Sequence, residues 1–522
     1  MHSTDMITPA KNNGAGDERY TAVIDVGSGS ARAVVMQVNP GGGVEIVAQQ
    51  RVNLNLMSHV NDAGMIDGAA VSSTLDALED FALIARGHGI QVIHAVGTAA
   101  LRESGNAAAI INAALDRFGV PLRLIDGRDE AAYCFIGAIH GLPVAGGILA
   151  DIGGGSMEIV RFGQRAILDS VSLPLGSLRI ANQFRLNDLP KAADVHSAYE
   201  HVHTTLAEAG VPALSAGESL VGSGGSVRLL SRLDRGREPY PIIKVHGYRI
   251  DANALSEQAR ALAVVSRSER TKIDGMNPER SHSIVGGAVA AHALSQYVNG
   301  DSILVSGQGL REGLARHPGP LPRDCSVSVP PLSLVRMASL TDLVARFVPR
   351  FSQRGERRAA LAGCIGALAW ENQEPKMTWA LECAAFLLDI GNAIDFYNRL
   401  NRTASIIVRT DLPGFTHRES ARIAAILLEC ERGRIPRRFR RSRLLPGEDV
   451  QLIEQAAVIL VLADELDSRL PPGCPANAVQ AARQGGKMTV RTPGWSAVAA
   501  PELSARWLKA FGENIQVTRC EK

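Results

Sequence analysis

Two short stretches of similar design constrain the fold of this chain more than any other feature. The first, DVGSGS, spans Asp25 to Ser30, and the second, DIGGGS, spans Asp151 to Ser156. Each stretch follows apolar residues. This pattern is typical of a buried strand that ends at an aspartate and continues into a glycine turn. Glycine lets the backbone approach an anion with several N–H groups turned toward it, although glycine after a strand is commonly just a turn. The pair, a domain apart, predicts two half-sites that face each other.

The surroundings of each stretch follow the pattern of a repeated α/β unit. Residues 20–38 predict two strands joined by a turn at 27–30, and residues 44–53 and 68–87 predict a third strand and a helix. Strands near 148, 157–162 and 165–170 repeat this order, and another glycine loop at 220–226 precedes a helix. We therefore expect an internal duplication, with α/β domains at 20–133 and 134–317 and their glycine loops directed toward a shared cleft.

The rest of the chain differs in character. A proline-rich stretch at 318–331 marks a boundary, after which residues 330–485 predict an all-helical domain. Residues 486–522 predict a small α+β domain that we expect to be separate. Residues 1–19 are polar, without the apolar core of a signal peptide, and predict a disordered tail.

Composition bounds the class of protein. Of 522 residues, 46% are hydrophobic and 21% charged, as in soluble globular proteins, and no stretch reaches the ~18 apolar residues of a membrane span. Seven cysteines without a Cys-x-x-Cys spacing predict a reduced, cytoplasmic setting and no zinc ribbon. The net charge of +2 hides seven arginines without an acid between 432 and 443. Such a run is either a solvated loop or attracts a polyanion, and we expect Arg437, Arg438, Arg440 and Arg441 to form a polyanion track.

Two further motifs supply chemistry. Thr98 and Arg102 stand at the start of a helix after a β-branched strand, where the arginine suits a bidentate phosphate contact or is a surface residue. Asp129 and Glu130 open the next helix. They either complement the helix dipole, or one of them is a general base.

The order of these motifs resembles the exopolyphosphatase and guanosine pentaphosphate phosphohydrolase family, within the superfamily of actin, hexokinase and Hsp70. The resemblance extends from Tyr20 to about Leu466 and includes VGT at 96–98, GRDEA at 127–131, LPLG at 173–176 and LREG at 310–313 beside the two loops. It implies two ribonuclease-H-like, actin-like ATPase domains and then an HD-like helical domain. Residues 387–391 read LLDIG without histidine, so we expect this domain to lack metal ligands and Asp389 to be a bystander.

The resemblance also implies roles for single residues. It implies Glu130 as the base that activates water, with assistance from Arg102. It implies Mg²⁺ as the cofactor, bound or supported by Asp151 and Glu158, with Asp25 as a further metal residue. The phosphate-binding residues that we expect are Gly27, Ser28, Gly29, Ser30, Thr98, Gly153, Gly154, Gly155, Ser156, Gly224 and Gly225.

The implied reaction is processive hydrolysis of the terminal phosphate of inorganic polyphosphate, and the arginine run favours this substrate because it would extend an anionic track. Hydrolysis of guanosine pentaphosphate is the nearest alternative. A phosphotransferase of the same superfamily and a catalytically silent alarmone sensor are others. The resemblance further implies a homodimer, and we expect no nucleic acid partner.

Overall fold

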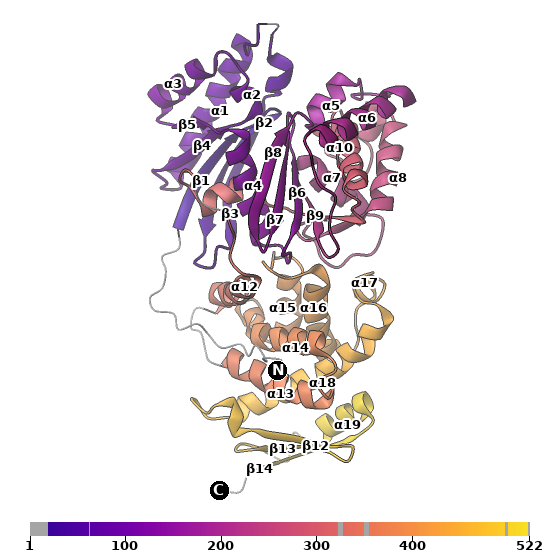
Figure 1. The fold of residues 1–522 in the computed structure, drawn as a ribbon. Coiled ribbons are helices and arrows are strands. Elements are labelled where there is room, and N and C mark those ends of the chain that lie inside the picture. The colour runs from indigo at the N-terminus through magenta and orange to yellow at the C-terminus, as the bar shows by residue number, and fades with distance from the viewer. Residues whose placement is uncertain (1–18, 62, 322–326, 349–353, 496–499, 520–522) are drawn as a thin grey trace. The chain divides into compact units, whose positions relative to one another are not determined.

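The computed structural model describes residues 19–61, 63–321, 327–348, 354–495 and 500–519. The chain forms two compact units (Figure 1). The N-terminal unit runs to Val335 without Glu238–Lys244, and the helical unit contains Glu238–Lys244 and the chain from Arg336 onward. The predicted tail at 1–19 lies outside the described residues, except for Arg19, which begins β1. None of the described helices combines the length and the hydropathy of a membrane span.

The first lobe of the N-terminal unit is built on a sheet of five strands. These are β1 (Arg19–Val26), β2 (Ser30–Val38), β3 (Val44–Asn53), β4 (Ile93–Gly97) and β5 (Leu122–Leu124), in the order β3-β2-β1-β4-β5. The first three pair antiparallel, whereas β4 and β5 run parallel to β1. Three helices belong to this lobe, α1 (Gly68–Gly87), α2 (Ala99–Arg102) and α3 (Ala107–Phe118), and the buried Phe81, Leu101 and Ile110 join them to the core of the sheet.

The second lobe repeats this design. Its strands are β6 (Gly147–Ile152), β7 (Met157–Gly163), β8 (Ala166–Leu173), β9 (Ser219–Ser223), β10 (Arg249–Asp251) and β11 (Ser302–Val305), in the order β10-β11-β9-β6-β7-β8. Apart from the edge strand β10, this is the order of the first sheet. Its helices are α5 (Ser177–Gln183), α6 (Ala192–Glu208), α7 (Gly225–Arg235), α8 (Ala252–Ala263), α9 (Arg267–Arg270) and α10 (Ile284–Tyr297). The repeated order confirms the predicted duplication of an α/β unit.

Two helices pack between the sheets, α4 (Gly127–His140) and α11 (Leu310–Arg316) (Figure 1). The predicted boundary at 133/134 falls inside α4, because buried side chains of this helix share a core with Val23 of β1 and Leu149 of β6. The helices touch through their backbones: a Cβ atom on Gly313 would lie 1.9 Å from the Tyr133 carbonyl oxygen. The relative position of α4 and α11 therefore depends on glycine.

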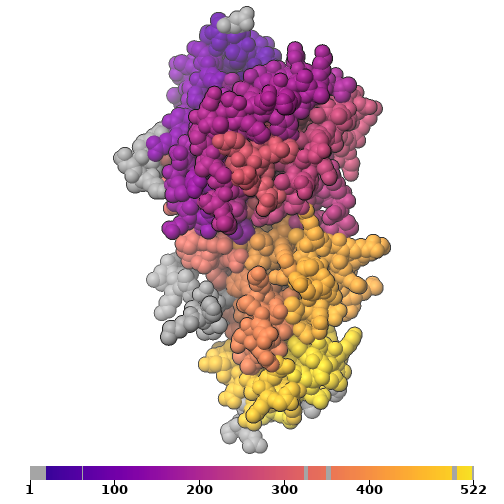
Figure 2. All heavy atoms as spheres, turned by 45° about the vertical axis from the view of Figure 1, so that its right-hand side comes forward, coloured from indigo at the N-terminus to yellow at the C-terminus, as the bar shows by residue number. Residues whose placement is uncertain are grey.

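The helical unit contains α12 (Leu332–Phe347), of which the part from Arg336 belongs to it, and α13 (Arg354–Ala369), α14 (Pro375–Leu387), α15 (Arg399–Ile407), α16 (His417–Arg432), α17 (Arg437–Arg440) and α18 (Gly447–Arg469). A small sheet of β12 (Gln480–Gln484), β13 (Lys487–Thr492) and β14 (Asn514–Arg519) follows, with α19 (Ala500–Phe511). We expected residues 486–522 to form a separate domain, and this was wrong. Met488, Val490 and Trp507 are buried in the same core as the helices, and Figure 2 shows the orange and yellow parts densely packed.

A buried guanidinium lies inside the helical unit. Arg358, wholly buried, donates from Nη2 to Asp389 Oδ2 at 2.8 Å and from Nη1 to Asp464 Oδ1 at 3.0 Å. Its Nε donates to the Ala385 carbonyl oxygen at 2.8 Å. Asp389, which we expected to be a bystander to metal binding, therefore has a structural contact, because its carboxylate holds one side of a buried cation.

Candidate active site

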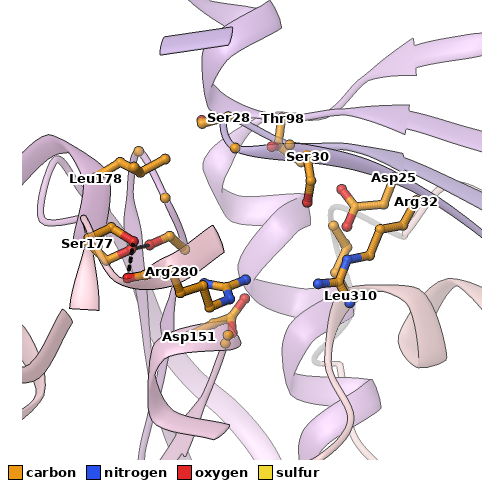
Figure 3. Close-up of a pocket in the computed structure, with 18 of the residues that line it drawn as sticks. Asp25, Ser28, Ser30, Arg32, Thr98, Asp151, Ser177, Leu178, Arg280 and Leu310 are labelled. Atoms are coloured by element: carbon orange, nitrogen blue, oxygen red, sulfur yellow. Dashed lines mark hydrogen bonds between the residues drawn. The ribbon is translucent and has the colours of Figure 1, made fainter. Parts of the chain in front are cut away.

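The two glycine loops line one pocket between the lobes of the N-terminal unit (Figure 3). Its volume is about 360 Å³. The lining includes every residue predicted to bind phosphate, from Gly27 to Ser30, Thr98, Gly153 to Ser156, Gly224 and Gly225, and also Asp25, Glu130 and Asp151. Arg102 and Glu158 are absent from the lining that the described residues form. The fold thus brings most of the predicted site together.

The loops have the same local structure and lie against each other. Gly27 N donates to Ser30 O at 3.2 Å, and Gly153 N donates to Ser156 O at 3.0 Å. A Cβ atom on Gly155 would lie 2.7 Å from Ser28 Oγ, so glycine lets the second loop lie this close to the first without moving that side chain. Gly224, at a φ of +93°, would place a Cβ atom 2.2 Å from the Ile152 carbonyl oxygen. These close approaches give the predicted glycines a steric reason.

The equivalent strands β1 and β6 each bring a carboxylate to the pocket. Asp151 Oδ2 accepts a hydrogen bond from Cys134 Sγ at 3.1 Å, and its Oδ1 accepts one from Ser223 Oγ. Both oxygens of Asp151 are therefore oriented by side chains of the same lobe or of α4. Burial raises the pKa of the Asp25 carboxyl, and the nearby Asp151 adds to this, while Arg311 and Arg32 oppose it.

Glu130 lies in the first turn of α4, where its backbone is fixed by a helix cap. The Asp126 side chain accepts a hydrogen bond from Asp129 N at 2.8 Å, a cap worth about 1 kcal/mol. Glu130 is only 7% exposed and lines the pocket, whereas Asp129 does not. Burial and then the carboxylate of Glu158 raise the pKa of Glu130 well above its usual range, and Arg102 opposes them. Of the two acids, the fold selects Glu130 as the general base candidate.

Arg102 and Glu158 take positions behind the pocket. Arg102 Nη1 donates to Glu130 Oε2 at 3.0 Å and to the Ile125 carbonyl oxygen at 2.8 Å, so in this structure it contacts the candidate base. Glu158 on β7 is 1% exposed and accepts a hydrogen bond from Ser172 Oγ at 2.9 Å. Burial and then Asp151 raise its pKa to about 7. Arg102 therefore acts on Glu130 through a hydrogen bond, and Glu158 interacts with Glu130 and Asp151 through its charge.

Six arginines line the pocket, and none was predicted from the sequence: Arg32, Arg51, Arg228, Arg267, Arg280 and Arg311. Asp25, Arg32 and Arg51 are register partners across β1, β2 and β3. Arg32 and Arg280 point toward each other from opposite walls (Figure 3). Burial and then the charges of neighbouring arginines lower the pKa of Arg32 to about 9. Such crowding of guanidinium groups favours an anionic ligand with several charges.

A signal for part of this set was present in the sequence. Once the turn at 27–30 is placed, the hairpin register puts Arg32 opposite Asp25. The arginines from the second lobe had no such signal, because Arg228 lies on α7 and Arg280 on a short 3₁₀ segment, η2 (Pro278–Arg280), far along the chain.

Comparison with known proteins agrees with this site. Residues 34–317 match the model of the Ppx/GppA phosphatase family. Exopolyphosphatase 1 of Mycobacterium leprae is 27% identical over 296 residues, which cover 56% of this chain and 87% of the relative. The guanosine-5'-triphosphate,3'-diphosphate pyrophosphatase of Vibrio vulnificus is 26% identical over 531 residues, which cover 97% and 95%.

Solved structures show the same fold. The crystal structure of the Aquifex aeolicus member of the Ppx/GppA family covers 58% of this chain and 98% of its own, with a TM-score of 0.52 and 24% identity. An exopolyphosphatase from Cytophaga hutchinsonii gives a TM-score of 0.52 at 23% identity, covering 57% and 96%. The family model covers more than half of the chain, including the second glycine loop, Asp151 to Ser156, and begins just after the first loop, Asp25 to Ser30. The sequence resemblance is thereby confirmed, and the chain belongs to the Ppx/GppA phosphatase family.

Proposed function

We propose that this protein hydrolyses the terminal phosphoanhydride bond of inorganic polyphosphate. The observation that carries the proposal is the composition of the pocket, which joins two glycine loops, six arginines and a buried glutamate. Among the described residues, the lining contains no Phe, Tyr or Trp, and its apolar side chains are Leu178 and Leu310. A chain of phosphates needs many cationic and N–H contacts, and it needs no apolar surface for stacking of a nucleobase. The exopolyphosphatases among the relatives support the same substrate.

Guanosine pentaphosphate is the second candidate substrate. The Vibrio relatives named for this nucleotide extend over 97% and 95% of the chain, whereas the mycobacterial exopolyphosphatases extend over 56%. The pocket has arginines enough for its phosphates as well. A comparison of the two substrates on the purified protein is therefore part of the test.

The residues of the pocket fit a Mg²⁺ ion. Mg²⁺ is held by one or two carboxylates together with waters and substrate phosphates, and Asp25 and Asp151 present two carboxylates to one cavity. Glu158 does not line the cavity, so we propose a supporting role for it, through its charge on Asp151 and Glu130. When bound, the ion would neutralise charge on the phosphate that is transferred.

The chain's own residues account for the other parts of the reaction. Backbone N–H groups of the loops at 27–30 and 153–156 hold oxygens of the terminal phosphate, and Arg32 and Arg280 hold the phosphates beyond it. Glu130 orients a water molecule and accepts its proton as the water oxygen attacks phosphorus. The bond to the bridging oxygen breaks, and the shortened chain leaves with the negative charge on that oxygen. Arg102 is a positioning residue that holds the Glu130 carboxylate.

The test replaces the proposed base. In Glu130→Gln we expect turnover of polyphosphate, measured as phosphate release, to fall by about 10²–10⁴-fold while polyphosphate still binds. Asp129→Asn is the matched control, since Asp129 is the preceding residue of α4 and does not line the pocket. Unchanged turnover in Glu130→Gln would show that Glu130 is not the base. Faster hydrolysis of guanosine pentaphosphate than of polyphosphate would select the second candidate, and transfer to an added acceptor would indicate a phosphotransferase.

The remaining proposals concern surroundings and assembly. Arg437, Arg438, Arg440 and Arg441 lie on or next to α17 with exposed side chains, and we propose that they attract the distal part of a polyphosphate chain. Replacement of these four arginines by glutamine should weaken the binding of long polyphosphate chains more than the binding of guanosine pentaphosphate. The five described cysteines are free thiols, in keeping with a reducing cytoplasm. The proposed homodimer is tested by sedimentation equilibrium.

A further inference from the structure

A carboxylate closes one side of the pocket between the lobes. Glu279 belongs to η2 (Pro278–Arg280) of the second lobe, and Arg51 and Asn53 belong to β3, the edge strand of the first. Arg51 Nη1 donates to Glu279 Oε2, and Asn53 Nδ2 donates to Glu279 Oε1. All three residues line the pocket. Both carboxylate oxygens are thus held by donors of the opposite lobe.

These residues lie at the side of the pocket away from the proposed base. Asp25, Arg32 and Arg51 form a row across three neighbouring strands, and Thr98 and Glu130 follow the strands on the other side of β1. Neighbouring strands are ~4.8 Å apart, so Arg51 lies about 10 Å from Asp25 across the sheet. An anionic chain that begins at Asp25 and runs along this row reaches Arg32 first and Arg51 next.

The guanidinium of Arg51 has an unused donor. Its Nε is buried and has no hydrogen-bond partner among the described residues, while Nη1 is bound to Glu279. A planar guanidinium binds a phosphate as it binds a carboxylate, through two parallel N–H groups. A phosphate that displaces the Glu279 carboxylate can accept the same hydrogen bond from Nη1.

We propose that Arg51 and Asn53 form a distal phosphate subsite, which the Glu279 carboxylate occupies until a sufficiently long anionic chain displaces it. This inference rests on the proposed function and adds a determinant of chain length. Short anions that end before β3 bind without moving Glu279. Longer chains must exchange the Glu279 carboxylate for one of their own phosphates, and Glu279 then also repels them as a neighbouring negative charge.

The experiment measures binding, without turnover, in the Glu130→Gln background. Isothermal titration with a long-chain polyphosphate and with pyrophosphate is compared before and after adding Glu279→Gln. Loss of one competing charge-assisted contact should tighten binding of the long chain about tenfold and leave pyrophosphate within about twofold. Glu257→Gln is the matched control, because Glu257 is an exposed residue of α8 paired with Arg237 outside the pocket. Adding Arg51→Met should abolish the effect of Glu279→Gln.

Three results would overturn the inference. The first is an equal gain in affinity for both anions, and the second is an unchanged affinity for the long chain. The third is a lower affinity for the long chain, which would mean that substrate binding requires the Glu279 contact. Failure of the Glu130→Gln protein to bind polyphosphate at all would instead reject the proposed function. The two failures are therefore distinguishable.

Discussion

The contact between α4 and α11 gives the sharpest test of how backbone geometry supports the site. A Cβ atom on Gly313 would lie 1.9 Å from the Tyr133 carbonyl oxygen, where ordinary contacts begin at 3.4 Å. In Gly313→Ala the two helices must therefore separate by about 1.5 Å at this point. Tyr133 lies one turn after Glu130 on α4, and Arg311 and Glu312 of α11 line the pocket. The substitution acts on both walls of the site without removing a polar group.

The displacement should affect both the stability of the protein and its turnover. Overpacking of this kind costs ~1–3 kcal/mol of stability, and a displacement near 1 Å costs about 10²-fold in turnover. We expect Gly313→Ala to lower Tm by a few degrees, at about 2 °C per kcal/mol for a unit of this size, and to lower phosphate release by about 10². Calorimetry and a phosphate-release assay measure these. Gly68→Ala, at the first residue of α1 with nothing within 4 Å of the added atom, is the control. Wild-type Tm and turnover in Gly313→Ala would refute the reasoning.

Three further predictions concern charge. In the wild type the Arg102 guanidinium opposes the effect of burial on Glu130, so Arg102→Met should raise the pKa of Glu130 further. The acid limb of the kcat/KM profile should then move to higher pH, and an unmoved limb would contradict this. Arg358→Met should lower the unfolding free energy of the helical unit by ~3–5 kcal/mol in urea titrations, and the exposed Arg402→Met by less than ~1 kcal/mol. Burial raises the pKa of Glu382 from 4.5 to about 7, so its contribution to stability is present below 4.5 and is lost as pH rises through about 7. Glu382→Gln should therefore raise Tm at about pH 8 more than at about pH 5, and equal shifts would contradict this.

Local patterns predicted much of the N-terminal unit. The strand at Val44–Asn53 and the helix at Gly68–Gly87 have the bounds expected from their apolar spacing. The strand β12 was missed, because Gln480–Gln484 has few apolar residues and forms an edge. The helix α15 (Arg399–Ile407) lies within the stretch that was predicted to be all-helical.

The site was predictable where it is local. Each glycine loop and its aspartate are contiguous in sequence, so the two loops were recognised from the repeated motif, and the resemblance to the family then implied the roles of Asp25 and Asp151. Arg280 was not, because its place opposite Arg32 depends on the packing of one lobe against the other. Arg102 was predicted, but its contact was not, since the hydrogen bond to Glu130 joins the end of α2 to the first turn of α4, 28 residues further along the chain.

The guanidinium enclosed between Asp389 and Asp464 has a consequence for how the helical unit responds to its environment. Oxygen-lined interiors of proteins often recruit an ion from solution, and then their integrity follows the supply of that ion. Here the positive charge belongs to the guanidinium of Arg358, which is covalently part of the chain. We therefore expect chelators and metal scarcity to leave this cluster unchanged.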